Sequence, residues 1–116
     1  MSFLDFKTLS DVDKAIVGQA LRAAADGPFF PDWEFQTLFG LKRTDVSAIA
    51  DAWPETTASL EDVEIAVNNS LNNLLGYPHQ MDAVWSKWIS IDRQHLNELF
   101  NRLHHRRGER FFDRMK

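Results

Sequence analysis

Apolar residues recur at intervals of three and four along most of the chain, a spacing typical of amphipathic helices rather than strands. The first such stretch follows Ser10, a residue type that favours the N-terminal cap of a helix, and two aspartates stand in its first turn. Gly27 and Pro28 provide a stop signal. The pattern therefore predicts a first helix over residues 11–26.

Two short helices are predicted next, over residues 33–39 and 45–53. Gly40 is suited to end the first of them, because glycine readily adopts the left-handed conformation found after helices. Thr44 is the expected cap of the second, and Pro54 disfavours helix continuation at the residue before it.

A longer fourth helix is expected to begin at Ser59, which forms a capping-box-like pair with Asp62 three residues on. The sequence Gly-Tyr-Pro at residues 76–78 ends it. Apolar residues at helical spacing along this helix form one stripe, and its four central members, Val63, Val67, Leu71 and Leu74, are expected to be buried. The stripe consists of Leu60, Val63, Val67, Leu71, Leu74 and Leu75.

A fifth helix over residues 81–89 and a sixth starting at Ser90 or Asp92 complete the pattern, with Gly108 expected to end or fray the last one. Alternating β-branched runs bounded by turns are missing from the sequence. The chain is therefore predicted to be all-α: an irregular orthogonal bundle of five to six short helices, forming one domain over residues 1–116.

Composition agrees with one globular domain, since 116 residues are 44% hydrophobic and 26% charged. The absence of cysteine excludes disulfides, thiolate catalysis and cysteine zinc sites. No stretch approaches the roughly 20 apolar residues of a membrane span, and residues 1–10 lack the apolar region of a signal peptide. We therefore expect a cytoplasmic protein.

Five aromatic residues in and just before the second predicted helix are expected to pack in the core: Phe29, Phe30, Trp33, Phe35 and Phe39.

Charge is distributed unevenly along the chain. Residues 1–92 hold six Lys or Arg and 14 Asp or Glu, whereas residues 93–116 hold seven and three. The acidic body is expected to repel nucleic acid and to attract basic partners. The basic segment, residues 102–116, is either a solvated helix end or a surface that docks on an acidic face, such as that of a second copy in a homodimer. Arginines recur every four residues along this segment, and two adjacent phenylalanines lie between the last two of them. The arginines are Arg102, Arg106, Arg110 and Arg114, and the phenylalanines are Phe111 and Phe112.

The pair of short helices around Gly40 resembles a DNA-binding helix-turn-helix in its apolar positions, a pattern of low specificity. The second helix of the pair would expose Asp45 and Asp51 and offer no cation to the phosphates. A structural helix pair is therefore favoured, and a DNA-binding regulator is kept as an alternative function. The apolar positions are Phe35, Phe39, Leu41, Val46 and Ile49.

Four asparagines inside the fourth helix are unusual, because asparagine is a poor helix former. We expect them to bond loop backbone, such as residues 77–79, or to form a polar contact face for a ligand or partner. No histidine pair has metal-ligand spacing, and no nucleophile or phosphate-loop motif is present. Hence no catalytic, cofactor-binding or metal residue is predicted, and an enzyme without a recognisable motif is a third alternative. The candidate contact face comprises Asn68, Asn69, Asn72, Asn73, Arg102, Arg106 and Arg110.

The strings FFPDWEF at residues 29–35, LFGL at 38–41 and NNLLGYP at 72–78 resemble those of a small uncharacterised bacterial protein family. The resemblance spans about residues 8–100 and implies a bacterial, cytosolic origin, but no functional residue. In its small size, acidity and aromatic content, the chain is also similar to inhibitor or immunity proteins that neutralise basic toxins. The favoured function is therefore non-catalytic binding of another protein, one of basic character.

Overall fold

The structure is a computed structural model that describes the backbone of residues 6 and 9–115, and the side chains of residues 6 and 9–104. Within these residues the chain forms six α-helices and one 3-10 turn, with no strand, so the predicted all-α class is confirmed. The elements are α1 (Asp11–Asp26), α2 (Asp32–Phe39), α3 (Arg43–Ala52), α4 (Leu60–Gly76), η2 (Asp82–Val84), α5 (Trp85–Trp88) and α6 (Arg93–Met115).

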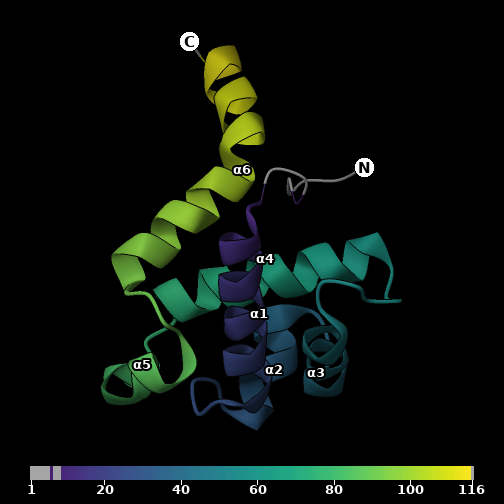
Figure 1. Cartoon of the computed structure of the whole chain (residues 1–116), viewed down its shortest axis with the longest axis vertical. Coiled ribbons are helices and arrows are strands. Elements are labelled where there is room, and N and C mark those ends of the chain that lie inside the picture. Colours follow the sequence, from purple (N-terminus) through teal and green to yellow (C-terminus); the bar gives the residue numbers. More distant parts are fainter. Residues whose placement is uncertain (1–5, 7–8, 116) are drawn as a thin grey trace.

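The helices differ in length from four to 23 residues and pack as an irregular bundle. In Figure 1, α1 passes across α4, with α2 and α3 near one end of α1 and α6 on the other side. The most extensive contacts are those of α1 with α3 and α4, and α4 also packs against α6 and α2. α1 and α4 are therefore the two helices around which the others are arranged.

The longest predicted helices begin where their caps indicated. The Ser10 hydroxyl accepts a hydrogen bond from the backbone N–H of Asp13 at 3.0 Å, and the Ser59 hydroxyl accepts one from Asp62 at 3.1 Å. Each bond satisfies one of the N–H groups that a helix leaves free in its first turn. Gly40 ends α2 with φ 70°, the left-handed conformation that its position predicted.

Two predicted boundaries were wrong. α3 begins at Arg43 rather than after Thr44, because the Asp45 carboxylate accepts the backbone N–H of Lys42 at 3.2 Å and caps the helix two residues earlier. The predicted helix over residues 81–89 is only a 3-10 turn and a four-residue α5. There the indole of Trp85 donates to the carbonyl of Ile91 at 2.8 Å, so the chain turns back on itself instead of continuing as a helix.

The expected end of the last helix at Gly108 was also wrong, because α6 continues to Met115. One glycine costs a helix only about 1 kcal/mol relative to alanine, so it need not end a helix whose neighbouring arginines and glutamate are good helix formers. The end of α6 leads away from the other helices in Figure 1.

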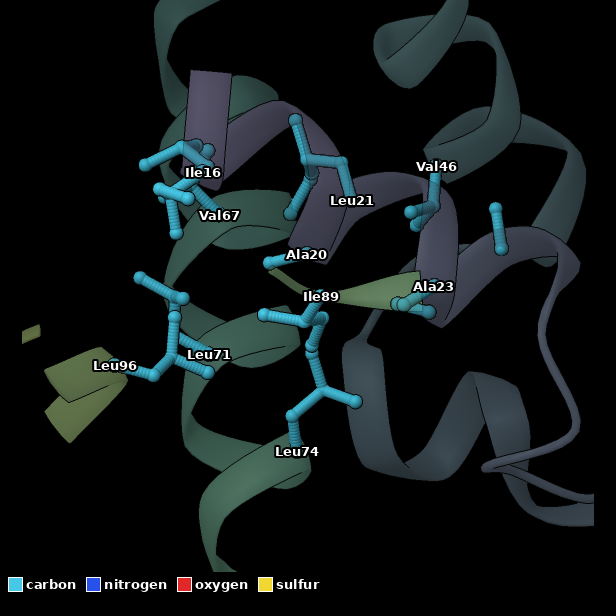
Figure 2. Packing of buried hydrophobic residues seen from close by; sticks show 14 of the residues in the cluster. Ile16, Ala20, Leu21, Ala23, Val46, Val67, Leu71, Leu74, Ile89 and Leu96 are labelled. Atoms are coloured by element: carbon cyan, nitrogen blue, oxygen red, sulfur yellow. The ribbon is translucent and has the colours of Figure 1, made fainter. Parts of the chain in front are cut away.

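The core lies between α1 and α4, closed by residues from the segment after α5 and from α6. Figure 2 shows Ile16 and Leu21 of α1 facing Val67 and Leu71 of α4, with Ile89 beside them. The predicted central stripe of α4 is confirmed as buried, as are four of the five predicted aromatic residues. Those aromatic residues are Phe29, Phe30, Phe35 and Phe39.

Two residues at predicted apolar positions are on the surface. Trp33, which was expected in the core, is 81% exposed, and Leu60, the first member of the apolar stripe of α4, is 56% exposed. Each stands in the first turn of its helix, at the edge of the bundle, where helical spacing continues but the partner helices do not reach. Periodicity therefore identified the correct face of each helix but not where its burial ends.

Replacing Leu71 with alanine is expected to lower the free energy of unfolding by about 2–5 kcal/mol, because this fully buried side chain would leave a cavity between α1 and α4. Urea unfolding followed by circular dichroism measures the change. Asn72→Ala, at an exposed position of the same helix, is the control and should lower stability by less than about 0.5 kcal/mol. Equal losses in both variants would contradict the assigned core.

Candidate functional site

Two of the four asparagines of α4 act on the end of α2. The Asn69 amide donates to the carbonyl of Phe39 at 2.8 Å, and the Asn73 amide donates to the carbonyl of Leu38 at 3.2 Å. Both carbonyls belong to the last turn of α2, where no intrahelical donor follows. This pair does bond backbone, but the carbonyls belong to the end of α2 rather than to a loop such as the expected segment at residues 77–79.

The other two asparagines differ from each other. Asn68 donates to the side-chain oxygen of Asn69 at 3.1 Å, and its own oxygen lies 2.9 Å from Nε2 of His104 on α6. Asn72 is exposed. The predicted asparagine face is thus divided between a joint with α2, a joint with α6 and one solvent-facing amide.

The arginines of the candidate contact face do not join the asparagines into one described surface. Arg102 pairs with Asp13 of α1 at 2.9 Å. The side chains of Arg106 and Arg110 lie outside the described residues, although both positions belong to α6. The contact between His104 and Asn68 joins the asparagine-bearing face of α4 to the middle of α6.

α2 and α3 form the helix pair that resembled a helix-turn-helix. Phe35, Phe39, Val46 and Ile49 are buried between and beneath the two helices, as the apolar pattern requires. The outward residues of α3 include Asp45 and Asp51, while Arg43 turns away from the surface that a nucleic acid would meet.

Arg43 is the residue that sequence reasoning missed. Its guanidinium donates to the carbonyls of Ala24, Ala25 and Phe30 at 3.2, 2.9 and 2.7 Å, and it lies 4.4 Å from the ring centroid of Phe35. A cation at the first residue of α3 is disfavoured by that helix's own dipole. At the end of α1 the same charge meets free carbonyls and a favourable dipole, which explains its position.

Each arginine with a described side chain is paired with an aspartate of the same chain. Arg22 forms ion pairs with Asp26 and Asp51, Arg43 with Asp32, Arg93 with Asp82, and Arg102 with Asp13. Since residues 1–104 contain 15 Asp or Glu and eight Lys or Arg, this pairing leaves an excess of carboxylates on the surface. A surface of this kind attracts positively charged partners.

Trp33 is an exposed aromatic side chain on a fixed support. On one side of it, Asp32 lies 2.9 Å from Nε of Arg43. On the other side of Trp33, Glu34 accepts a hydrogen bond from the Tyr77 hydroxyl at 2.5 Å. This bond raises the pKa of Tyr77, and the hydroxyl is a donor at neutral pH. The helix backbone at Trp33 is therefore tied to α3 and to the segment after α4, while the indole is 81% exposed.

His79 is buried where α4 ends. Its Nδ1 accepts the backbone N–H of Met81 at 3.0 Å, so in the neutral ring the proton is on Nε2, which lies 3.2 Å from the carbonyl of Leu74. Nη2 of Arg93 lies 3.1 Å from that same Nε2. Burial, and then the nearby Arg93 charge, lower the pKa of His79, so the ring is neutral at pH 7.

Among the residues that the structure describes, no three His, Asp or Glu side chains gather into a possible metal site. In the same part of the chain, no helix combines the length and apolarity needed to cross a bilayer. Comparison of the chain with models of known protein families, with curated proteins and with solved structures found no match. The resemblance to a bacterial family therefore stays a prediction, and function must be argued from the site itself.

His79 and His95 are expected to give opposite pH dependence of stability. The lowered pKa of His79 means that the folded state loses stability as pH falls below about 6.5, because the unfolded ring takes up a proton first. His95 is bonded to Asp92 at 2.7 Å, which raises its pKa, so its contribution is present below about 6.5 and is lost as pH rises above it.

Urea unfolding of wild type, His79→Gln and His95→Gln between neutral and mildly acidic pH tests this pair. Wild type should lose stability relative to His79→Gln on acidification, and gain stability relative to His95→Gln. A pH dependence of the same sign for both differences would contradict the placement of His79 in a neutral, buried site.

Proposed function

We propose that this protein is a non-catalytic, cytoplasmic binding protein that covers a basic surface of another protein, in the manner of small inhibitor or immunity proteins. The observation that carries the proposal is Trp33, which is 81% exposed and yet held on a helix anchored at both neighbouring residues. Tryptophan is enriched among the few interface residues that supply most of the binding free energy.

The anchoring of α2 supports a contact role for Trp33. A side chain on a backbone that is already ordered loses little further conformational freedom when a partner covers it. The ties of Asp32 to α3 and of Glu34 to Tyr77 give Trp33 this property. The contact would gain apolar burial at a low ordering cost.

The charge of the surface supports a basic partner. Arg22 is paired with Asp26 and Asp51, and Arg43 is paired with Asp32 and also donates to backbone carbonyls at the end of α1. The carboxylates in excess then set the sign of the local field, which speeds association with cationic surfaces and slows it with nucleic acid. The alternative of a DNA-binding regulator gains no support from this arrangement.

Affinity capture from extracts of the source cells, with quantitative mass spectrometry, tests the proposal. A protein of net positive charge should be retained by wild type in stoichiometric amount and lost by about tenfold or more with Trp33→Ser, since an interface tryptophan typically contributes 2 kcal/mol or more. Gln36→Ala, also exposed on α2, is the matched control and should retain it. Equal recovery by both variants, or capture of nucleic acid alone, would contradict the proposal.

A further inference from the structure

A shallow hollow of about 450 Å³ lies beside the Trp53-Pro54 turn, near the N-terminal ends of α1 and α4. Its walls are largely apolar and include Phe6, Leu9, Trp53 and the exposed Leu60. A second hollow of about 430 Å³ shares Trp53 and Pro54 with it and extends along the first turn of α1. Together they form an apolar depression at the opposite end of α1 from Arg43.

Carboxylates outnumber cations around this depression. Glu55 lines the first hollow and Asp11 lines the second, and Glu61 and Asp62 follow Leu60 in the first turn of α4. Among the described residues that line the two hollows, Lys14 is the one cation. A segment that combines aromatic and cationic side chains is therefore complementary to the depression in both apolarity and charge.

Residues 105–116 of this chain have that composition. They contain four arginines and one lysine against two acidic residues, together with the adjacent Phe111 and Phe112. Among the described side chains of α6, Leu96, Leu99 and Leu103 are buried, and the sequence then places Arg106 and Arg107 at the next helical positions. The apolar stripe of α6 is therefore interrupted by cationic residues before Phe111.

The course of α6 brings its end to the correct side of the molecule. The ion pair of Arg102 with Asp13 fixes α6 beside the first turn of α1, two residues from Asp11 of the depression. From Leu103 the helix runs on to Met115, about 18 Å at 1.5 Å per residue, and leads away from the other helices (Figure 1). The backbone of α6 therefore leaves from the side of the molecule that carries the depression.

We propose that residues 105–116 of a second copy occupy the depression beside Trp53-Pro54, so that two chains exchange the ends of α6 in a symmetric dimer. A two-fold axis uses the same contact twice, because each chain gives one α6 end and receives the other. The contact is separate from the surface around Trp33, since Asp32 next to it is tied to the opposite end of α1.

Sedimentation equilibrium of the full chain over a concentration series tests the dimer. Wild type should dimerise, and Leu60→Ser, Glu55→Lys and the double variant Phe111→Ser, Phe112→Ser should each weaken dimerisation by about tenfold or more. Trp33→Ser is the matched control, an exposed apolar residue outside the contact, and should dimerise as wild type does. Because Leu60 and Glu55 are exposed, these variants should keep the wild-type circular dichroism spectrum.

Mixing the variants tests the exchange itself. Leu60→Ser retains a native α6 end and the double phenylalanine variant retains a native depression, so their mixture restores one of the two contacts. The mixture should therefore associate more tightly than either variant alone. The proposal would be overturned by a wild-type chain that stays monomeric, by variants that dimerise normally, or by a mixture that associates no more tightly than its components. A monomer whose residues 105–116 instead bind duplex DNA or anionic vesicles would overturn it too.

Discussion

The carbonyl groups left free in the last turns of short helices are the constraint on which this bundle depends. Each helix leaves up to four such groups without an intrahelical donor, and in a chain of short helices they are a large share of the backbone. Side chains from other elements supply the donors here. The end of α1 receives Arg43, the end of α2 receives Asn69 and Asn73, and the end of α4 receives His79 and Arg93.

These bonds also determine which surfaces are available for binding. Arg43 ties the end of α1 to the start of α2 through Phe30 and Asp32, and thereby fixes the helix that carries Trp33. The same bonds withdraw its charge from the surface and leave the body acidic. At the other end of α1, Arg102 of α6 pairs with Asp13, and the backbone of α6 then leads away from the other helices (Figure 1).

Features that depend on residues close in sequence could be predicted. Ser10 and Ser59 indicated the starts of α1 and α4 because a cap acts within one turn, and the stripe through Leu71 indicated the face of α4 that is buried. Roles that depend on tertiary contacts could not. The partner of Arg43 lies 18 residues away and that of Asn69 lies 30 residues away, and no local pattern relates such positions. The exposure of Trp33 likewise follows from where the bundle ends, which periodicity does not encode.

The most direct test of this account is the stability of Arg43→Met, which keeps most of the side-chain length but removes the donors to the carbonyls at the end of α1. Lys42→Met, the adjacent exposed residue, is the control. Urea unfolding should show that Arg43→Met lowers the free energy of unfolding by about 1–3 kcal/mol, the cost of leaving partly buried carbonyls unpaired, while Lys42→Met changes it by less than about 0.5 kcal/mol. An Arg43→Met protein as stable as the control would contradict the account.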